Sequence, residues 1–296
     1  MAVRTLPSAP GSLTLYRRAV TGSFALPLLR RVPVVGAGAA RALPDVQYEL
    51  PGVELDAAHV AAYARVCGFA VRDELPATYL HVRAFPLAMR LMTDARFPFG
   101  VIGLVHVANR IDQRRPVRLG DRPTVRVRAE ALRDHERGRQ FDVVAEALLD
   151  GDVVWEDRST YLRRGGGDGG GDRAARASAD RPDAPAAEAI WPAPGDIGRR
   201  YGAVSGDRNP IHLHDLSAKA FGQPGAIAHG MWLKARCLAA LAPELPPAFV
   251  IDVRFKRPVL LPARMAFSSR AEDGGRAFAL HDARRGLPHL EGRIAS

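Results

Sequence analysis

The sequence predicts an α+β protein in which an antiparallel sheet wraps over a long central helix, and this arrangement occurs twice along the chain. Gly, Ala, Asp and Pro dominate residues 165–189, a composition that cannot bury enough apolar surface to fold, so we expect a flexible linker there. The linker separates a first half, residues 45–164, from a second half, residues 190–296. Each half has one helix-like apolar segment followed by alternating segments, which is typical of a helix packed on hairpin-connected strands.

The helix-like segments read FPLAMRLM in the first half and GMWLKARCLAALA in the second. The alternating segments are TVRVRAEAL, QFDVVAEALL and VVWEDRSTYLRR in the first half, and RMAFSSRA, RAFALHD and LEGRIA in the second. Alternation of apolar and polar residues, with β-branched and aromatic side chains, indicates half-buried antiparallel strands.

Short matches between the halves predict an internal duplication. YARVCG at residues 63–68 matches YGAVSG at residues 201–206, and Arg-Pro-Val occurs at both 115–117 and 257–259. The two matches are offset by 138 and 142 residues, which is nearly the same separation.

Residues 1–44 contain six Arg and no acidic residue. No apolar run approaches the roughly 18–20 residues that a membrane span requires, so we expect no integral membrane segment. We interpret this segment as a poorly ordered or loosely docked basic extension. A weak peripheral contact with a membrane or a partner is the alternative.

The net charge of +10 raises the question of nucleic acid binding. The extension supplies +6 of it, and no basic stripe interleaved with aromatic residues follows, so we expect no nucleic acid partner. Only two cysteines are present, Cys67 and Cys237. A disulfide framework is therefore not expected, and a reducing, cytoplasmic location is.

Two other patterns suggest cofactors or metals and are rejected. VVGAGAAR at residues 34–41 lacks the third Gly and the βαβ setting of a dinucleotide fingerprint, and no cofactor is expected. His212, His214 and Asp215 with His229 offer metal-ligand side chains. Pro210 and the apolar helix leave no obvious third ligand, so no metal is expected.

The stretch YGAVSGDRNPIHLH, residues 201–214, carries the predicted chemistry. Pro210 disfavours helix at Asn209, so a sharp turn follows Asp207 and can bring Asp207 and His212 to one side of the loop. Asn209 can brace the turn through its amide. A carboxylate and a neutral imidazole that converge on one water form a proton-transfer pair. In the alternative interpretation, Asp207 caps the turn and His212 is a structural histidine.

The segment GQPGAIAHGMWLKARCLAAL places Ala228, His229 and Gly230 at the start of the second central helix. Free N–H groups at a helix start stabilise an anion, and Gly230 allows close approach of a substrate. A thioester carbonyl at this position gains an oxyanion hole as it becomes enolate-like. Together, the two segments suggest proton chemistry at the α and β carbons of an acyl thioester.

YGAVSGDRNPIH followed by AIAHGMW resembles the signature of MaoC-like, (R)-specific enoyl-CoA hydratases, which have the hotdog fold. The resemblance is specific over residues 201–233 and extends less strongly over 190–296. It implies that Asp207 and His212 activate one water for syn addition across a trans-2-enoyl thioester, or catalyse the reverse dehydration. It also implies that Asn209 and His229 support the site and that the Gly230 N–H stabilises the carbonyl.

The family includes chains with two hotdog folds and one active site, whose degenerate half makes room for a longer acyl chain. In our alignment, Phe69 stands opposite Asp207, Glu74 opposite His212, and Phe85-Pro86 opposite His229-Gly230. Phe cannot move a proton and Pro has no N–H, so the first half is predicted to shape the site rather than catalyse. Pro262-Ala263 replaces the family's usual Gly-Asp, which Gly120-Asp121 keeps in the first half.

The sequence leaves the carrier open between coenzyme A and acyl carrier protein. Lys256 and Arg257, expected on a strand near the pocket mouth, are candidates to meet its phosphates. A hotdog thioesterase and a non-catalytic acyl-binding subunit are the alternative functions. A homodimer is possible but optional, because two hotdog folds can already pair within one chain.

Overall fold

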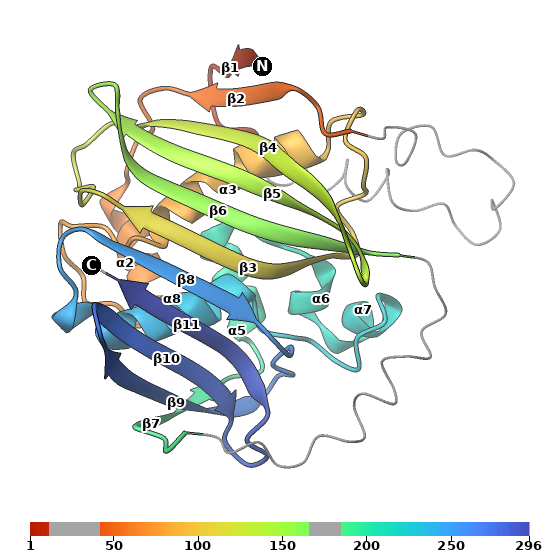
Figure 1. The fold of residues 1–296 in the computed structure, drawn as a ribbon, viewed down its shortest axis with the longest axis vertical. Helices are drawn as coiled ribbons and strands as arrows, with labels where there is room; N and C mark the ends of the chain where they lie inside the picture. The colour runs from red at the N-terminus through yellow and green to blue at the C-terminus, as the bar shows by residue number, and fades with distance from the viewer. Residues whose placement is uncertain (12–41, 166–184, 296) are drawn as a thin grey trace, which may run out of the picture.

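The computed structural model describes residues 1–11, 42–165 and 185–295, and eleven strands in these ranges form one sheet. The strands are β1 (Ala2–Thr5), β2 (Val46–Leu50), β3 (Leu104–Gln113), β4 (Thr124–His135), β5 (Gly138–Leu149), β6 (Asp152–Arg164), β7 (Ala189–Ala193), β8 (Phe249–Phe255), β9 (Ala263–Glu272), β10 (Gly275–Asp282) and β11 (Pro288–Ala295). The helices are α2 (Ala57–Cys67), α3 (Tyr79–Met92), α5 (Ile197–Ser205), α6 (Pro210–Leu213), α7 (Asp215–Ala220) and α8 (Gly230–Leu241), with a 3₁₀ turn at Ala242–Glu244. The helices lie against one face of the sheet (Figure 1).

The sheet repeats itself about its centre, as the predicted duplication requires. Its order is β1-β2-β4-β5-β6-β3-β8-β11-β10-β9-β7, so that each strand of the first half from β2 onward has a counterpart in the second. The antiparallel pair β3 and β8 joins the halves, with Arg110 opposite Asp252. These two residues are 142 apart, the same offset as the two Arg-Pro-Val segments. The α+β class and the paired helix-and-sheet units are confirmed.

The six predicted alternating segments all form strands, β4 to β6 and β9 to β11. The first predicted helix begins earlier than its apolar run, at Tyr79, and contains Pro86. Strand β3 was not predicted from the residue pattern. A register shift between His106 and Ala108 interrupts its alternation, which hides the two-residue period on which strand prediction depends.

Two segments of the chain differ from the expectation or cannot be compared with it. Residues Ala2–Thr5 form β1 and pair in parallel with β2, so this part of the basic extension is docked as an edge strand. Most of the basic extension, residues 12–41 with the VVGAGAAR segment, lies outside the described residues. The same holds for residues 166–184 of the predicted linker. None of the described helices is long and apolar enough to cross a membrane.

Candidate active site

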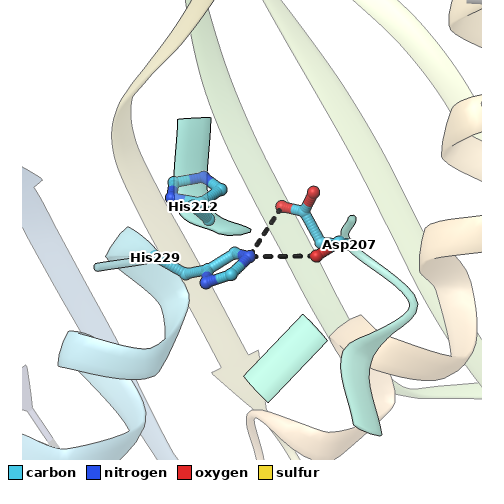
Figure 2. Close-up of side chains that lie close together, drawn as sticks. All are labelled: Asp207, His212 and His229. Atoms are coloured by element: carbon cyan, nitrogen blue, oxygen red, sulfur yellow. Dashed lines mark hydrogen bonds and ion pairs between the residues drawn. The ribbon is translucent and has the colours of Figure 1, made fainter. Parts of the chain in front are cut away.

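The site begins where helix α5 ends. Gly206 adopts a left-handed conformation, φ 74°, which a Gly accepts without strain and which ends the helix. Asp207 follows, and its Oδ1 accepts a hydrogen bond of 3.1 Å from the Asn209 N–H. Its own N–H donates to Ser205 Oγ at 3.1 Å. Asp207 therefore does cap the turn, and its second carboxylate oxygen is directed toward the histidines of the site (Figure 2).

His212 lies in the short helix α6, which Asn209 caps through its side chain and Pro210 begins. The buried His212 ring hydrogen-bonds through Nδ1 to the Ile227 carbonyl at 2.7 Å. Because a carbonyl only accepts, Nδ1 must carry the proton, and Nε2 of the neutral ring keeps its lone pair. Burial lowers the pKa of His212, although the Asp207 carboxylate acts in the opposite direction. The ring is therefore a neutral base at pH 7.

His229, the residue before helix α8, holds the other two groups together. Its Nε2 donates to the Asp207 carbonyl at 3.0 Å and lies 3.9 Å from Asp207 Oδ2. Its ring stacks on His212 with 3.7 Å between ring centroids. Burial, and then His212, lowers the pKa of His229 to about 3, so His229 is neutral. Figure 2 shows the three side chains facing one another.

Ligand atoms of Asp207, His212 and His229 lie within 4.8 Å of one another, the spacing that a metal ion would need. Of the residues considered from the sequence, His212 and His229 belong to this cluster, whereas His214 and Asp215 do not. His214 is exposed, and Asp215 Oδ1 instead accepts the Ala226 N–H at 2.8 Å, which closes the loop that carries the site.

Gly230 is the first residue of helix α8, so its N–H has no acceptor within the helix. A side chain at this position would meet the Phe255 ring, because a Cβ placed on Gly230 would lie 3.0 Å from Phe255 Cε1. Gly230 thus lets Phe255 pack directly against the start of helix α8. This position is the one expected for an oxyanion hole.

A cavity of about 1770 Å³ joins these groups to the first half of the chain. Asp207, His212 and Gly230 line it on one side, and Phe85 and Tyr161 line it on the other. Its lining also includes Lys256, Arg257, Arg264, Arg284 and Arg285. Arg264, Arg284 and Arg285 were not singled out from the sequence, because Arg264 and the Arg284-Arg285 pair come to line one cavity only when separate segments of the second half fold together.

Lys256 and Arg257 directly follow strand β8 rather than lying on it, because the strand ends at Phe255. The expected position on a strand was therefore wrong by one and two residues. The Lys256 ammonium is also partly neutralised, since it lies 2.8 Å from Glu291 Oε2.

The first half lacks the loop that carries Asp207, Asn209 and His212, which corrects our alignment of the two halves. The Leu75 N–H bonds to the Val117 carbonyl, just as the Ala228 N–H bonds to the Val259 carbonyl. In the first half, Leu75 comes seven positions after Gly68, the Gly that ends the helix. In the second half, Ala228 comes 22 positions after Gly206. The first half is thus shorter by the segment that carries Asp207, Asn209 and His212.

Pro76-Ala77, rather than Phe85-Pro86, therefore occupies the position of His229-Gly230. Glu74 bridges to Arg118 as Ile227 bridges to Leu260, so Glu74 is the counterpart of Ile227 and not of His212. Phe69 still corresponds to Asp207, because it follows Gly68 as Asp207 follows the equivalent Gly206. Phe85 lies two helical turns further along the chain and faces the shared cavity.

Two glycines of helix α5 are part of the site and were missed. A Cβ on Gly198 would lie 1.8 Å from the His212 carbonyl oxygen, and one on Gly202 would lie 2.9 Å from the Asp207 carbonyl oxygen. Their four-residue spacing places both on one helix face, which allows the catalytic loop to pack directly on the helix backbone. The four-residue spacing of Gly198 and Gly202 was the sequence feature that could have indicated this close packing.

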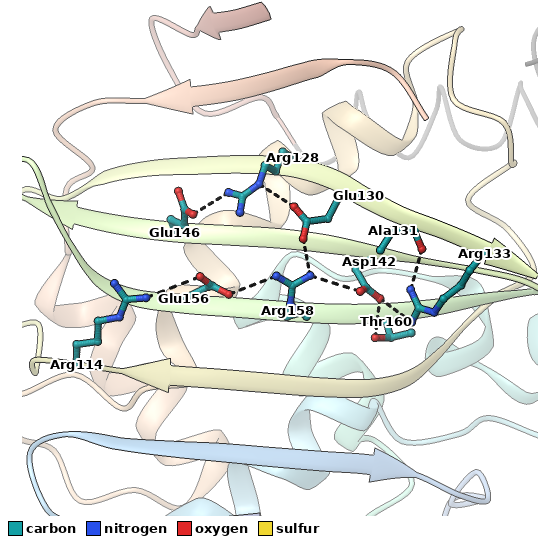
Figure 3. Close-up of polar contacts among 10 residues, drawn as sticks. All are labelled: Arg114, Arg128, Glu130, Ala131, Arg133, Asp142, Glu146, Glu156, Arg158 and Thr160. Atoms are coloured by element: carbon teal, nitrogen blue, oxygen red, sulfur yellow. Dashed lines mark hydrogen bonds and ion pairs between the residues drawn. The ribbon is translucent and has the colours of Figure 1, made fainter. Parts of the chain in front are cut away.

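The outer face of the first half's sheet was a second possible interaction surface, because arginines are frequent there. Figure 3 shows that these arginines lie in a row with acidic side chains. Arg158 contacts Glu130 at 2.6 Å and Asp142 at 3.4 Å, and Arg128 contacts Glu130 at 3.0 Å and Glu146 at 2.7 Å. Burial would raise the pKa of Glu130, but Arg158 and Arg128 outweigh it and lower the pKa. This row is a mixed-charge surface rather than a basic one.

Comparison with known proteins agrees with the geometry. Residues 182–292 match the family described as the MaoC like domain. The 3-hydroxyacyl-thioester dehydratase X of Mycobacterium tuberculosis is 37% identical over 292 residues, which cover 96% of this chain and 98% of that protein.

Two solved structures show the same arrangement. A crystal structure of HtdX of Mycobacterium tuberculosis has a TM-score of 0.75 and 37% identity, with 84% of this chain and 98% of that chain covered. A MaoC-like dehydratase from Phytophthora capsici has a TM-score of 0.67 at 18% identity, with 86% of this chain and 95% of that chain covered, and shows the shared fold. Asp207, the neutral His212 and the start of helix α8 thus lie within a pair of hotdog-type units. The chain belongs to the family of MaoC-like dehydratases.

Proposed function

We propose that Asp207 and His212 activate one water that adds across a trans-2-enoyl thioester to give an (R)-3-hydroxyacyl thioester, and that they catalyse the reverse dehydration. Membership of the MaoC-like dehydratase family makes the chain a lyase of the hydratase/dehydratase type. One observation supports the residue assignment: the Asp207 carboxylate, the His212 ring and the Gly230 amide all line the same cavity.

The tautomer of His212 defines its role. Its Nδ1–H is fixed on the Ile227 carbonyl, so Nε2 is the atom that can take a proton from water as the water oxygen bonds to C3. The Asp207 carboxylate accepts a hydrogen bond from the other hydrogen of that water. The electron pair of the double bond moves toward the thioester, whose oxygen is stabilised by the Gly230 N–H. A proton returned to C2 by the same pair completes the addition, so one water is consumed and no other reactant is needed.

The remaining residues have supporting roles in this proposal. Asn209 and His229 hold Asp207 and His212 in place through the contacts described above. Lys256 and Arg257, at the cationic part of the cavity lining, bind phosphate of the carrier, which is coenzyme A or acyl carrier protein. The Mycobacterium tuberculosis relative is named for dehydration of a 3-hydroxyacyl thioester, which supports that direction here.

Two broader predictions accompany the function. Cys67 and Cys237 are both free and buried, which supports a reducing, cytoplasmic location. The β3–β8 pair already joins two hotdog units within one chain, so one chain completes the cavity and a homodimer is optional. Size-exclusion chromatography with light scattering, run beside the activity assay, tests the second point.

The function is tested by loss of the absorbance of the conjugated thioester, with trans-2-enoyl-CoA chains of several lengths. We expect turnover by the wild type and a fall of about 10²–10⁴-fold for Asp207→Asn and for His212→Ala. His214→Ala is the matched control, because this exposed histidine lies two residues further on and should leave the rate unchanged. Chiral analysis should find the (R) product.

Three outcomes contradict the proposal. Full activity of His212→Ala would exclude the assigned base. Release of free thiol without a 3-hydroxyacyl product, detected with a thiol reagent, would indicate a thioesterase. Absence of turnover with coenzyme A and acyl carrier protein substrates alike would leave an acyl-binding subunit.

A further inference from the structure

The first half, which has no catalytic loop, contains an Asp–His pair of its own. Asp157 on strand β6 is buried, and its Oδ2 pairs with His81 Nδ1 at 2.9 Å. Its Oδ1 accepts hydrogen bonds of 2.9 Å from both the Asn109 amide and the Ser159 hydroxyl. His81 lies in the first turn of helix α3, and nothing in the proposed hydration mechanism uses this pair.

A buried lysine balances the charge of Asp157. The Lys234 ammonium donates to the side-chain and backbone oxygens of Asn109 and to the Ile251 carbonyl, so all three of its N–H donors have acceptors. Burial would raise the pKa of Asp157, but His81 and Lys234 outweigh it and the pKa is lowered. Asp157 is therefore ionised and only accepts, so His81 Nδ1 carries the proton. Nε2 is then a hydrogen-bond acceptor in the neutral ring and a donor in the charged ring, and a hydroxyl group can bond to either form.

His81 also contributes to the wall of the cavity. His81 is part of the cavity lining and its side chain is 14% exposed. Among the described residues, its only hydrogen-bond partner is Asp157, through Nδ1. Nε2 is not among the enclosed polar atoms that lack a partner, so a molecule in the cavity can reach it.

The pair lies beyond the expected position of the thioester. Phe255 packs against the Gly230 backbone, the His106 ring lies 5.1 Å from the Phe255 ring, and the His81 ring lies 6.3 Å from the His106 ring. An acyl chain that starts at Gly230 and follows this wall meets the Phe255 ring first. In these contacts the His106 ring links Phe255 to His81, so His81 comes later along the wall.

We propose that His81, oriented by Asp157, binds a hydroxyl group carried by the acyl chain beyond the reacting carbons, so that the substrate class is hydroxylated acyl thioesters. A hydroxyl can donate to Nε2, whereas a methylene cannot, and an unoccupied acceptor in an otherwise enclosed wall would be costly to desolvate with a plain chain. This inference rests on the proposed function only for the position of the thioester.

The test measures binding, so that it does not depend on turnover. Saturated acyl-CoA thioesters without a hydroxyl at C3 can be neither hydrated nor dehydrated, and calorimetry with plain chains and with chains hydroxylated at successive carbons from C4 onward compares their Kd values directly. We expect one hydroxylated isomer to bind the wild type about five- to tenfold more tightly than the plain chain, the value of a single net hydrogen bond. His81→Leu should lose this preference.

Two further variants separate binding from a structural effect. His81→Gln can donate its amide to Asp157 and present its carbonyl oxygen as the acceptor, so we expect it to keep the preference. Phe85→Leu, on the same helix and in the same cavity, should weaken the binding of plain and hydroxylated chains by the same factor. If His81→Leu is poorly folded, His81→Gln and Phe85→Leu still test the hydroxyl preference.

Equal Kd values for plain and all hydroxylated chains in the wild type, or a preference that survives in His81→Leu, would overturn the inference. The result is independent of the hydration assay. A wild type that hydrates plain enoyl chains but shows no hydroxyl preference refutes the subsite alone, whereas a hydroxyl preference without any hydration refutes the proposed function alone.

Discussion

Replacement of Gly198 by Ala should separate the packing of the catalytic loop from its chemistry. Gly198 is in helix α5, and an added Cβ would lie 1.8 Å from the His212 carbonyl oxygen, whereas ordinary contact begins at 3.4 Å. The helix and the loop must therefore separate by 1.6 Å at this point. Both are backbone, so no side-chain rotation can relieve the contact.

The expected magnitudes follow from this displacement. Ala is favoured over Gly inside a helix by about 1 kcal/mol, so helix propensity alone would make the variant more stable. Overpacking typically costs about 1–3 kcal/mol. We expect this cost to exceed the gain in helix propensity, because the contact is with a backbone carbonyl oxygen, so the variant should be less stable than the wild type. A catalytic group displaced by about 1 Å can cost about 10²-fold in rate, so kcat/KM should fall by about that factor or more.

Enoyl-CoA hydration and thermal unfolding of the same preparation measure both effects. Gly195→Ala is the matched control, since it lies three residues earlier and a Cβ there has no atom within 4 Å. The control should keep wild-type kcat/KM. If Gly198→Ala is as active and as stable as the wild type, the direct packing of helix α5 on the His212 backbone is refuted.

Two further predictions concern protonation. Burial lowers the pKa of Lys234 to about 7, so between pH 7 and the ordinary lysine pKa of about 10.4 the unfolded chain binds more protons and stability rises with pH. Lys234→Met should remove this part of the rise, measured as the difference in urea unfolding free energy between pH 7 and pH 9.5, and identical differences in both proteins would contradict it. Burial lowers the pKa of His212 below 6.5, so the acid limb of the kcat/KM profile should have its midpoint below pH 6.5, where the base is protonated. An acid limb at or above pH 6.5 would contradict a buried neutral base, and His214→Ala should leave the profile unchanged.

Local pattern was sufficient for most elements and for the reacting pair. The alternation in segments such as QFDVVAEALL predicts a strand because successive side chains face opposite sides of a sheet, and β5 is found there. The turn enforced by Pro210 and the helix start at Gly230 are also local properties. They predict that Asp207 and His212 lie together near a free amide, and the geometry places them so.

Local pattern failed where a feature depends on a distant partner. Strand β3 carries an irregularity at His106 that breaks the period, yet β3 pairs with both β6 and β8 and forms the junction of the two halves. The comparison of the halves also failed between Gly68 and Tyr79, because a missing loop shifts the alignment and only the hydrogen bond of Leu75 to Val117 restores it.

The choice of Asp207, His212 and Gly230 as candidate catalytic groups and the repeated α+β class follow from residues close together in the chain, because turn, helix-start and alternation signals act over a few residues. The partners of those groups do not. His229 stacks on His212, Gly198 meets the His212 carbonyl, and Asp157 reaches His81 only after strands and helices remote in sequence pack together. Burial lowers the pKa values of His212 and His229, and burial is a property of the folded chain as a whole.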